Sequence, residues 1–113
     1  MLNQGDIIFV TFPFSDLKSV KKRPALIISN DNYNNQSADI IVMAITSSLT
    51  AKNHFIEIDN TDLKQGVIPR KSYIRVDKIF SLNKSLVLGK FSIVSDEIIN
   101  KTTEMLNDII KQA

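Results

Sequence analysis

The sequence predicts an α+β fold, in which a small, strongly curved antiparallel β-sheet or barrel is followed by one C-terminal helix. Short apolar runs rich in β-branched and aromatic residues recur along most of the chain, and each has the length of a β-strand. Polar, turn-forming segments separate these runs, a pattern typical of small antiparallel sheets and barrels. Near the C-terminus the apolar period changes from that of a strand to that of a helix.

The strand-length runs cover residues 7–12, 25–29, 40–45, 55–58 and 73–80, and a further run at 86–91 can add one more strand around Gly89. The segments between them, 13–22, 30–38, 47–53 and 59–71, are expected to form turns and loops. The Asn-rich stretch 30–35 is included among these loops. Because no linker or internal repeat interrupts the pattern, residues 1–113 are predicted to form a single domain.

A C-terminal amphipathic helix is predicted to begin after Ser95. Ser95 is a suitable N-cap residue, and Asp96 and Glu97 place negative charge in the first turn, where the helix dipole favours it. The residues that follow recur at helical spacing as Ile98, Ile99, Thr102, Met105, Leu106, Ile109 and Ile110. This stripe predicts that the helix packs on the sheet.

Length and composition exclude several classes of protein. A chain of 113 residues can bury roughly two-thirds of its unfolded surface in one core, so a cleft deeper than a groove is expected to need a second subunit. With no cysteine and a single histidine, His54, we expect no disulfide, no metal site and no cofactor. The N-terminus lacks a signal pattern, and no apolar run approaches the roughly 20 residues that span a bilayer, so a cytoplasmic protein without membrane contact is expected.

The net charge of +2 is too small to identify a nucleic-acid-binding protein, but the positive charges are clustered. One cluster consists of Lys18, Lys21, Lys22 and Arg23, and a second of Lys64, Arg70, Lys71 and Arg75. Both could follow a phosphate backbone. The alternative is that they are ordinary solvated loop side chains.

Arg23 and Pro24 stand between the first basic cluster and the apolar run 25–28. A guanidinium presents a planar fork of donors that suits phosphate, and Pro24 fixes the backbone direction just before the strand begins. The pair therefore predicts a phosphate site on a rigid scaffold.

Four segments together resemble the MazF/PemK family of toxin endoribonucleases. They are Gly-Asp-Ile-Ile at 5–8, Lys-Arg-Pro-Ala-Leu-Ile-Ile-Ser-Asn-Asp at 22–31, Val-Met-Ala-Ile-Thr-Ser at 42–47 and Arg-Val-Asp-Lys-Ile at 75–79. Any one segment occurs by chance in many proteins, whereas four in this order and at these spacings are specific. The match runs from about Gly5 to the C-terminal helix.

This resemblance implies an SH3-like small antiparallel barrel with a terminal helix, working as a homodimer whose interface contributes to the substrate groove. It also implies a sequence-selective, metal-independent endoribonuclease that cleaves single-stranded RNA. Such an enzyme is the toxin of a toxin–antitoxin system, and its protein partner is a cognate antitoxin. In metal-independent cleavage the ribose 2′-hydroxyl attacks its own phosphate, which leaves a 2′,3′-cyclic phosphate and a 5′-hydroxyl end.

The resemblance assigns catalytic roles to Arg23 and Thr46. Arg23 could neutralise the charge on the phosphorane, and the hydroxyls of Thr46 and Ser47 could donate hydrogen bonds to its non-bridging oxygens. The alternative for Thr46 and Ser47 is that they simply end a strand and begin a turn.

Arg75 and Asp77 are two residues apart in a predicted strand, so their side chains are expected to share a face with Tyr73 and Ile79. The opposite face, formed by Ile74, Val76 and Phe80, is expected to point toward the core. In the PemK branch of the family the matching pair has acid and base roles. Because an arginine ordinarily cannot deprotonate in a protein, Asp77 is the expected base. The alternative is a surface ion pair worth at most about 1 kcal/mol.

The remaining substrate-binding candidates are Lys21, Lys22, Asn30, His54, Phe14 and Phe55. Phe14, Tyr33 and Phe55 lie in or beside predicted loops, where an aromatic ring could stack on an unpaired base, although core packing is the alternative. His54 lies at the start of a predicted strand, where contact with RNA or solvent is favoured over a catalytic role.

Two other functions stay open. One is a noncatalytic toxin of the same fold that acts on DNA gyrase through its C-terminal helix, although those relatives lack the Arg-Pro and Arg-x-Asp arrangement seen here. The other is a nucleic-acid-binding module without activity.

Overall fold

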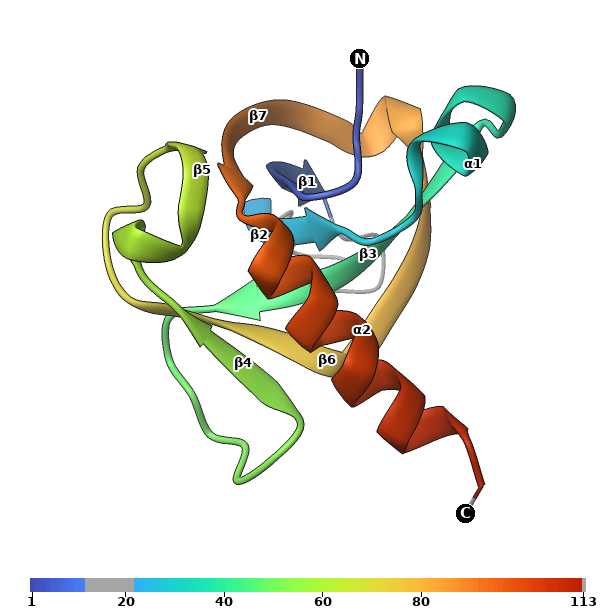
Figure 1. The fold of residues 1–113 in the computed structure, drawn as a ribbon. Coiled ribbons are helices and arrows are strands. Elements are labelled where there is room, and N and C mark those ends of the chain that lie inside the picture. The colour runs from blue at the N-terminus through green and yellow to red at the C-terminus, as the bar shows by residue number, and fades with distance from the viewer. Residues whose placement is uncertain (12–21, 113) are drawn as a thin grey trace, which may run out of the picture.

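The computed structural model describes residues 1–11 and 22–112 (Figure 1). Phe14, Lys18 and Lys21, together with most of the predicted connection 13–22, lie outside the described residues. The strands are β1 (Asp6–Thr11), β2 (Lys22–Ile27), β3 (Asp39–Thr46), β4 (Phe55–Ile58), β5 (Leu63–Gly66), β6 (Ser72–Asn83) and β7 (Val87–Val94). The helices are α1 (Asp31–Gln36) and α2 (Asp96–Ile110), and the 3-10 turns are η1 (Asn60–Asp62) and η2 (Lys84–Leu86).

These strands form one antiparallel sheet with the order β4-β6-β3-β2-β1-β7-β5. The sheet curls strongly, and α2 lies across one of its faces (Figure 1). The predicted α+β class, a small SH3-like antiparallel barrel with a C-terminal helix, is thereby confirmed in the form of a seven-stranded half-barrel.

One segment predicted to be a loop, 30–38, contains the short helix α1. Asn30 caps this helix, since its side chain accepts a hydrogen bond from the Tyr33 backbone N–H at 2.8 Å. Asn34 is buried and donates from its amide nitrogen to the Ser29 carbonyl at 2.9 Å. Asn-rich composition predicts turns, whereas here a cap and a buried tertiary contact stabilise a helical turn.

The segment 59–71, predicted to be a turn, contains the edge strand β5. Its sequence is polar, and it forms a strand because it pairs with β7, from Leu63 opposite Val94 to Gly66 opposite Ser92. Gly66 has a φ of +81°, and a Cβ there would lie 2.5 Å from the Phe91 carbonyl oxygen. Only glycine therefore allows β5 to approach β7 so closely.

Two hydrophobic clusters lie on the two sides of the sheet. Alternation along β1 sends Ile7 to one cluster and Ile8 to the other. The first cluster is covered by α2 through Ile98. The second is closed by partly buried side chains, among them Phe80. Because both faces of the sheet carry buried apolar residues, the sheet must curl to enclose them.

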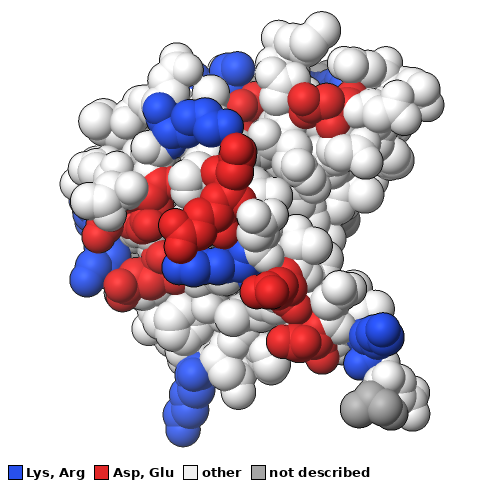
Figure 2. Space-filling view, viewed as in Figure 1, with Lys and Arg blue, Asp and Glu red and all other residues white. Residues whose placement is uncertain are grey.

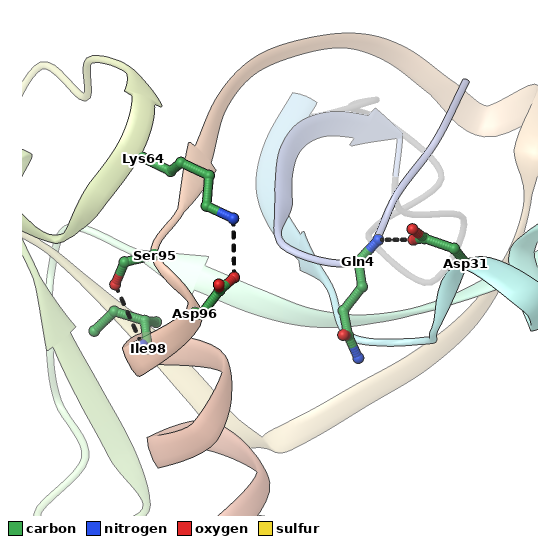
Figure 3. Close-up of polar contacts among 6 residues, drawn as sticks. All are labelled: Gln4, Asp31, Lys64, Ser95, Asp96 and Ile98. Atoms are coloured by element: carbon green, nitrogen blue, oxygen red, sulfur yellow. Dashed lines mark hydrogen bonds and ion pairs between the residues drawn. The ribbon is translucent and has the colours of Figure 1, made fainter.

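The start of α2 is fixed as predicted. Ser95 is the N-cap, with its hydroxyl accepting from the Ile98 N–H at 3.4 Å, and Asp96 pairs with Lys64 of β5 at 2.9 Å (Figure 3). Both side chains of the ion pair are exposed, so it orients the helix more than it stabilises the fold. None of the helices within residues 1–11 and 22–112 is long and apolar enough to cross a membrane.

The N-terminal turn explains the Gly5-Asp6 motif. Gly5 has a φ of +94°, and its backbone bonds to both Ile27 and Val94. Asp6 is buried and accepts from the Asn3 N–H at 2.9 Å, with Lys90 at 3.4 Å. The Gln4 N–H donates to Asp31 at the start of α1 at 2.8 Å (Figure 3). This motif is therefore a structural junction.

Candidate functional site

A cavity of about 450 Å³ opens where β1, β2 and β3 meet the segment that leads into β6. Its lining residues are Ile7, Phe9, Lys22, Arg23, Pro24, Ile45, Thr46, Ser47, Ile58, Ile68, Pro69, Arg70, Ser72 and Phe91. The four isoleucines are buried and belong to the core cluster beneath α2, so they form an apolar floor. We call this space the Arg23 cavity.

Three cations line the Arg23 cavity: Lys22, Arg23 and Arg70. Among the residues that the structure describes, no carboxylate lies within ion-pair distance of any of them. The other members of the second basic cluster are paired instead, Lys64 with Asp96, Lys71 with Glu57 and Arg75 with Asp77. Of that cluster, Arg70 lines the cavity and has no carboxylate within ion-pair distance among the described residues.

The strand register explains why Arg23 and Thr46 line the same space. β2 and β3 pair from Ile27 opposite Val42 to Ala25 opposite Ala44, and the same register extended by two residues would place Arg23 opposite Thr46. Both residues lie at strand ends, where side chains are free to meet a ligand. Two residues 23 positions apart in the sequence thus line one cavity.

The Thr46 hydroxyl is also part of a turn. Its Oγ1 donates to the Ser48 carbonyl and accepts from the Ser48 N–H, both at 3.1 Å. The sequence left a turn role and a phosphate role open, and this geometry gives the hydroxyl the turn contacts while leaving Thr46 on the cavity wall.

Arg75 and Asp77 do not line the Arg23 cavity. Their ion pair, with Arg75 Nη2 and Asp77 Oδ1 separated by 3.4 Å, confirms that they share a face. Ile74 and Val76 are fully buried in the cluster beneath the cavity, also as predicted. Since alternate side chains of a strand point to opposite faces, Arg75 points away from the cavity floor.

The backbone around this pair is irregular. Met43 of β3 pairs with Ile79 and Ile45 with Ile74, so residues 75–78 of β6 stand opposite Ala44 alone. Within the described part of the chain, the buried Nε of Arg75 has no hydrogen-bond partner. Arg75 therefore keeps an unused donor beside its ion pair.

Three further candidates lie elsewhere. Phe55 packs edge-on against Tyr73, with ring centroids 5.7 Å apart, and His54 precedes it with a φ of +65° at an exposed turn. Neither lines the Arg23 cavity, and nor does Asn30, which caps α1. The predicted substrate-binding residues Lys22 and Ser47 do line it.

Asn30 lines a second, smaller groove between α1 and α2, of about 350 Å³. Tyr33 and Thr102 also line this groove. Thr102 is buried, and its hydroxyl has no partner among the described residues.

Sequence reasoning missed Phe9 and Phe91 as site residues and did not select Arg70 from its cluster. Phe9 looks like a core residue of an apolar strand, and Phe91 lies at the end of a predicted strand. The available signal was the strand alternation of β1, which puts Phe9 on the same face as Ile7, but the curl that opens a cavity over that face is a tertiary feature.

The segment that carries Arg70 is tied down by polar contacts. Asn60 accepts from the Ile68 N–H at 2.7 Å, and Asp59 and Asp62 form a reciprocal capping box around η1. Hydrogen bonds from the Thr61 hydroxyl and backbone N–H lower the pKa of Asp59 below its usual value, and the charge of Lys71 adds to this effect. The far wall of the cavity is therefore anchored through η1.

The face crossed by α2 has a different charge. The helix contains four acidic residues, Asp96, Glu97, Glu104 and Asp108, and one lysine, Lys101. Figure 2 shows acidic side chains following the line of the helix across this face. The surface of α2 is therefore richer in acidic side chains than the lining of the Arg23 cavity, which among the described residues contains three cations and no carboxylate.

Comparisons with known proteins agree with this architecture. A family model described as "PemK-like, MazF-like toxin of type II toxin-antitoxin system" matches residues 3–110. Endoribonuclease EndoA of Bacillus subtilis (strain 168) is 28% identical over 107 residues, which cover 94% of this chain and 91% of that protein.

Two solved structures share the fold. A MazE–MazF structure from Deinococcus radiodurans is 16% identical with a TM-score of 0.79, and the match covers 99% of this chain and 97% of that one. An endoribonuclease in complex with its cognate antitoxin from mycobacterial species is 18% identical with a TM-score of 0.78 over the whole of both chains. Because the family model spans nearly the entire sequence, the chain belongs to the PemK-like, MazF-like toxins of type II toxin–antitoxin systems.

Proposed function

We propose that this toxin is an endoribonuclease that cuts single-stranded RNA at selected sequences by attack of the ribose 2′-hydroxyl, without a metal ion. The observation that carries the proposal is one cavity in which Arg23 and Thr46 meet over an apolar floor, with Lys22 and Arg70 as further cations. A nucleotide has the matching chemistry, since its phosphate is anionic and its base is flat and apolar on both faces.

In the proposed reaction the 2′-oxygen forms a bond to the adjacent phosphorus, and the bond from phosphorus to the 5′-oxygen breaks. Arg23 holds the non-bridging oxygens and neutralises the charge that develops on the phosphorane. The hydroxyls of Thr46 and Ser47 donate to the same oxygens, for which Thr46 releases its bond to the Ser48 carbonyl. The products are a 2′,3′-cyclic phosphate and a 5′-hydroxyl end.

The sequence predicts that Asp77 is a general base, with a surface ion pair to Arg75 as the alternative. A general base must come within hydrogen-bond reach of the proton that it removes. Asp77 lies outside the Arg23 cavity and is paired with Arg75, so we assign it the orienting role, with Arg75 contacting the RNA backbone outside the cavity. The 2′-hydroxyl proton then passes to water or to the RNA, and water protonates the 5′-oxygen.

The proposal includes a homodimer, a cognate antitoxin and a cytoplasmic site of action. Structures of similar fold are described as complexes with an antitoxin, which supports the second partner. Exposed apolar side chains at Ile79, Ile109 and Ile110 offer surface for contact between two copies. Light scattering of the purified chain measures the oligomeric state directly.

The test is incubation of the purified protein with end-labelled single-stranded RNA in EDTA. Discrete cuts with 2′,3′-cyclic phosphate ends are expected, and Arg23→Ala should slow them by about 10²- to 10³-fold, which excludes a contaminating nuclease. Binding without cuts would indicate an inactive RNA-binding module. No binding together with inhibition of DNA gyrase supercoiling would indicate the noncatalytic toxin.

A further inference from the structure

Phe9 is an exposed aromatic residue in the middle of a strand whose neighbours are fully buried. Ile8 and Val10 have no exposed surface, whereas 40% of Phe9 is exposed. The ring of Phe9 stacks on that of Phe91, with centroids 4.5 Å apart and an interplanar angle of 22°. Both residues line the Arg23 cavity.

The pairing of β1 with β7 explains this arrangement. Ile7 pairs with Ser92 and Ile8 with Lys90, so Phe91 is an extra residue in a bulge of β7. The bulge turns the Phe91 ring beside Phe9. Directly opposite Phe9 stands Gly89, which has no side chain to cover the ring.

The backing ring is itself fixed from the other side. Gly66 allows β5 to close on the backbone at Phe91, and Phe91 packs against the core cluster beneath α2. Phe9 therefore has one face supported by a ring that is held in place and part of its surface open to the cavity. An aromatic side chain held in this way loses little freedom when a flat ligand stacks on it.

We propose that the open face of Phe9, supported by Phe91, binds one unpaired base of the RNA by stacking, next to the phosphate held by Arg23. On β2, Pro24 lies opposite Phe9 and Arg23 lies opposite Val10, so the ring and the guanidinium come from adjacent cross-strand positions. This inference rests on the proposed RNA cleavage and names the group that positions the nucleotide at the cut.

The cavity suits a base better than a simple anion. Its floor is made of isoleucine side chains and its rim includes three cations without an ion-pair partner among the described residues, so one nucleotide can place its base on the apolar part and its phosphate on the charged part. A volume of about 450 Å³ falls within the range of roughly 300–1,000 Å³ for small-molecule pockets.

The experiment is a coupling measurement between protein and RNA. The cut site is first mapped with the wild-type chain. Binding is then measured by anisotropy on RNA with a 2′-deoxy nucleotide at the cut, either intact or abasic at one flanking position. The variants are Phe9→Leu, which removes the aromatic face, Phe9→Tyr, which keeps it, and Tyr33→Leu as matched control. Tyr33 is 38% exposed but lines the other groove.

Phe9→Leu is expected to weaken binding of intact RNA by about 5- to 150-fold, and Phe9→Tyr by less than about 3-fold. The abasic position should lower the affinity of the wild type by a similar factor. It should hardly change the affinity of Phe9→Leu, because that variant has already lost the stacking contact. Tyr33→Leu should bind like the wild type. If Phe9→Leu fails to fold, the same comparison is made with Phe9→Met, which also removes the aromatic ring and fills the space with a flexible apolar side chain.

Equal abasic penalties in wild type and Phe9→Leu at both flanking positions would overturn the stacking proposal while leaving RNA cleavage intact. The stacking proposal would also be overturned if the abasic penalty disappeared in Tyr33→Leu instead of Phe9→Leu. A wild-type chain that neither cuts nor binds RNA would overturn both this inference and the proposed function. The stacking proposal would also be excluded if an apolar side chain of the antitoxin packs on Phe9 while substitutions of Phe9 leave RNA affinity unchanged.

Discussion

Arg75 and Asp77 form an ion pair at 3.4 Å, and neither residue lines the cavity that Arg23 and Thr46 line. Thr46 pairs with Tyr73 of β6, two residues before Arg75, so the ion pair comes from strand positions next to a cavity residue. A place beside the cavity but outside it makes Asp77 the most informative position for mutation.

Asp77→Asn is expected to lower RNA affinity and single-turnover rate together, by about 10-fold or less, because the amide no longer orients the Arg75 guanidinium by charge. The acidic limb of the pH–rate profile should persist. A general base would behave differently, with a rate loss of roughly 10²- to 10⁴-fold at unchanged affinity and loss of that limb. Single-turnover rates and dissociation constants across pH distinguish the two roles.

Arg23→Ala and Arg23→Lys should each reduce the cleavage rate by about 10²- to 10³-fold, the usual cost of removing one well-placed transition-state donor. Lysine retains the charge but not the planar fork that can hold two phosphate oxygens. Both variants should fold, since Arg23 is exposed at the end of β2. Near wild-type cleavage by the lysine variant would show that charge alone is sufficient.

Thr46→Val should reduce the rate by a similar factor, and Thr46→Ser should retain most of it, because serine keeps the hydroxyl. Valine also removes the two hydrogen bonds with Ser48, so thermal melting is measured in parallel. A valine variant that is less stable yet cuts at the normal rate would leave Thr46 with the turn role alone.

Arg70→Ala should reduce the slope of log affinity against log salt by about 0.7, the value for one phosphate contact on single strands. The adjacent Lys71→Ala is the matched control, because Lys71 pairs with Glu57 at 3.8 Å and does not line the cavity. Its slope should equal that of the wild type. An unchanged slope for Arg70→Ala would place the RNA backbone elsewhere.

Asp59 gives a prediction for stability against pH. Its pKa is lower in the folded chain than the ordinary 3.8, because the Thr61 hydroxyl and N–H bond to the carboxylate. The stabilisation is therefore complete above the ordinary pKa and is lost as pH falls through the lower folded value. In urea titrations from about pH 6 to pH 2, Asp59→Asn should show a smaller loss of stability at the acid end than the wild type. Asp108→Asn, at an exposed site on α2, is the control, and identical acid profiles for Asp59→Asn and wild type would contradict this account.

Much of the architecture follows from local sequence. Strand-length apolar runs, the Ser95 cap and the helical stripe after it predicted the sheet and α2, because these signals depend only on neighbours in the chain. Ile74 and Val76 were assigned to the core by alternation alone. The segments α1 and β5 were missed, since one depends on a buried contact between Ser29 and Asn34 and the other on pairing with β7.

The candidate site divides in the same way. Residue type predicted Arg23 to be a phosphate ligand, and family resemblance added Thr46, but their meeting at one cavity is a tertiary result. The exclusion of Asp77 from the cavity and the inclusion of Phe9 and Arg70 depend on how the sheet curls and on the bulges in β6 and β7. Each residue type has its own chemistry. Long-range packing, which no local pattern encodes, decides which residues lie close enough together to act on one phosphate.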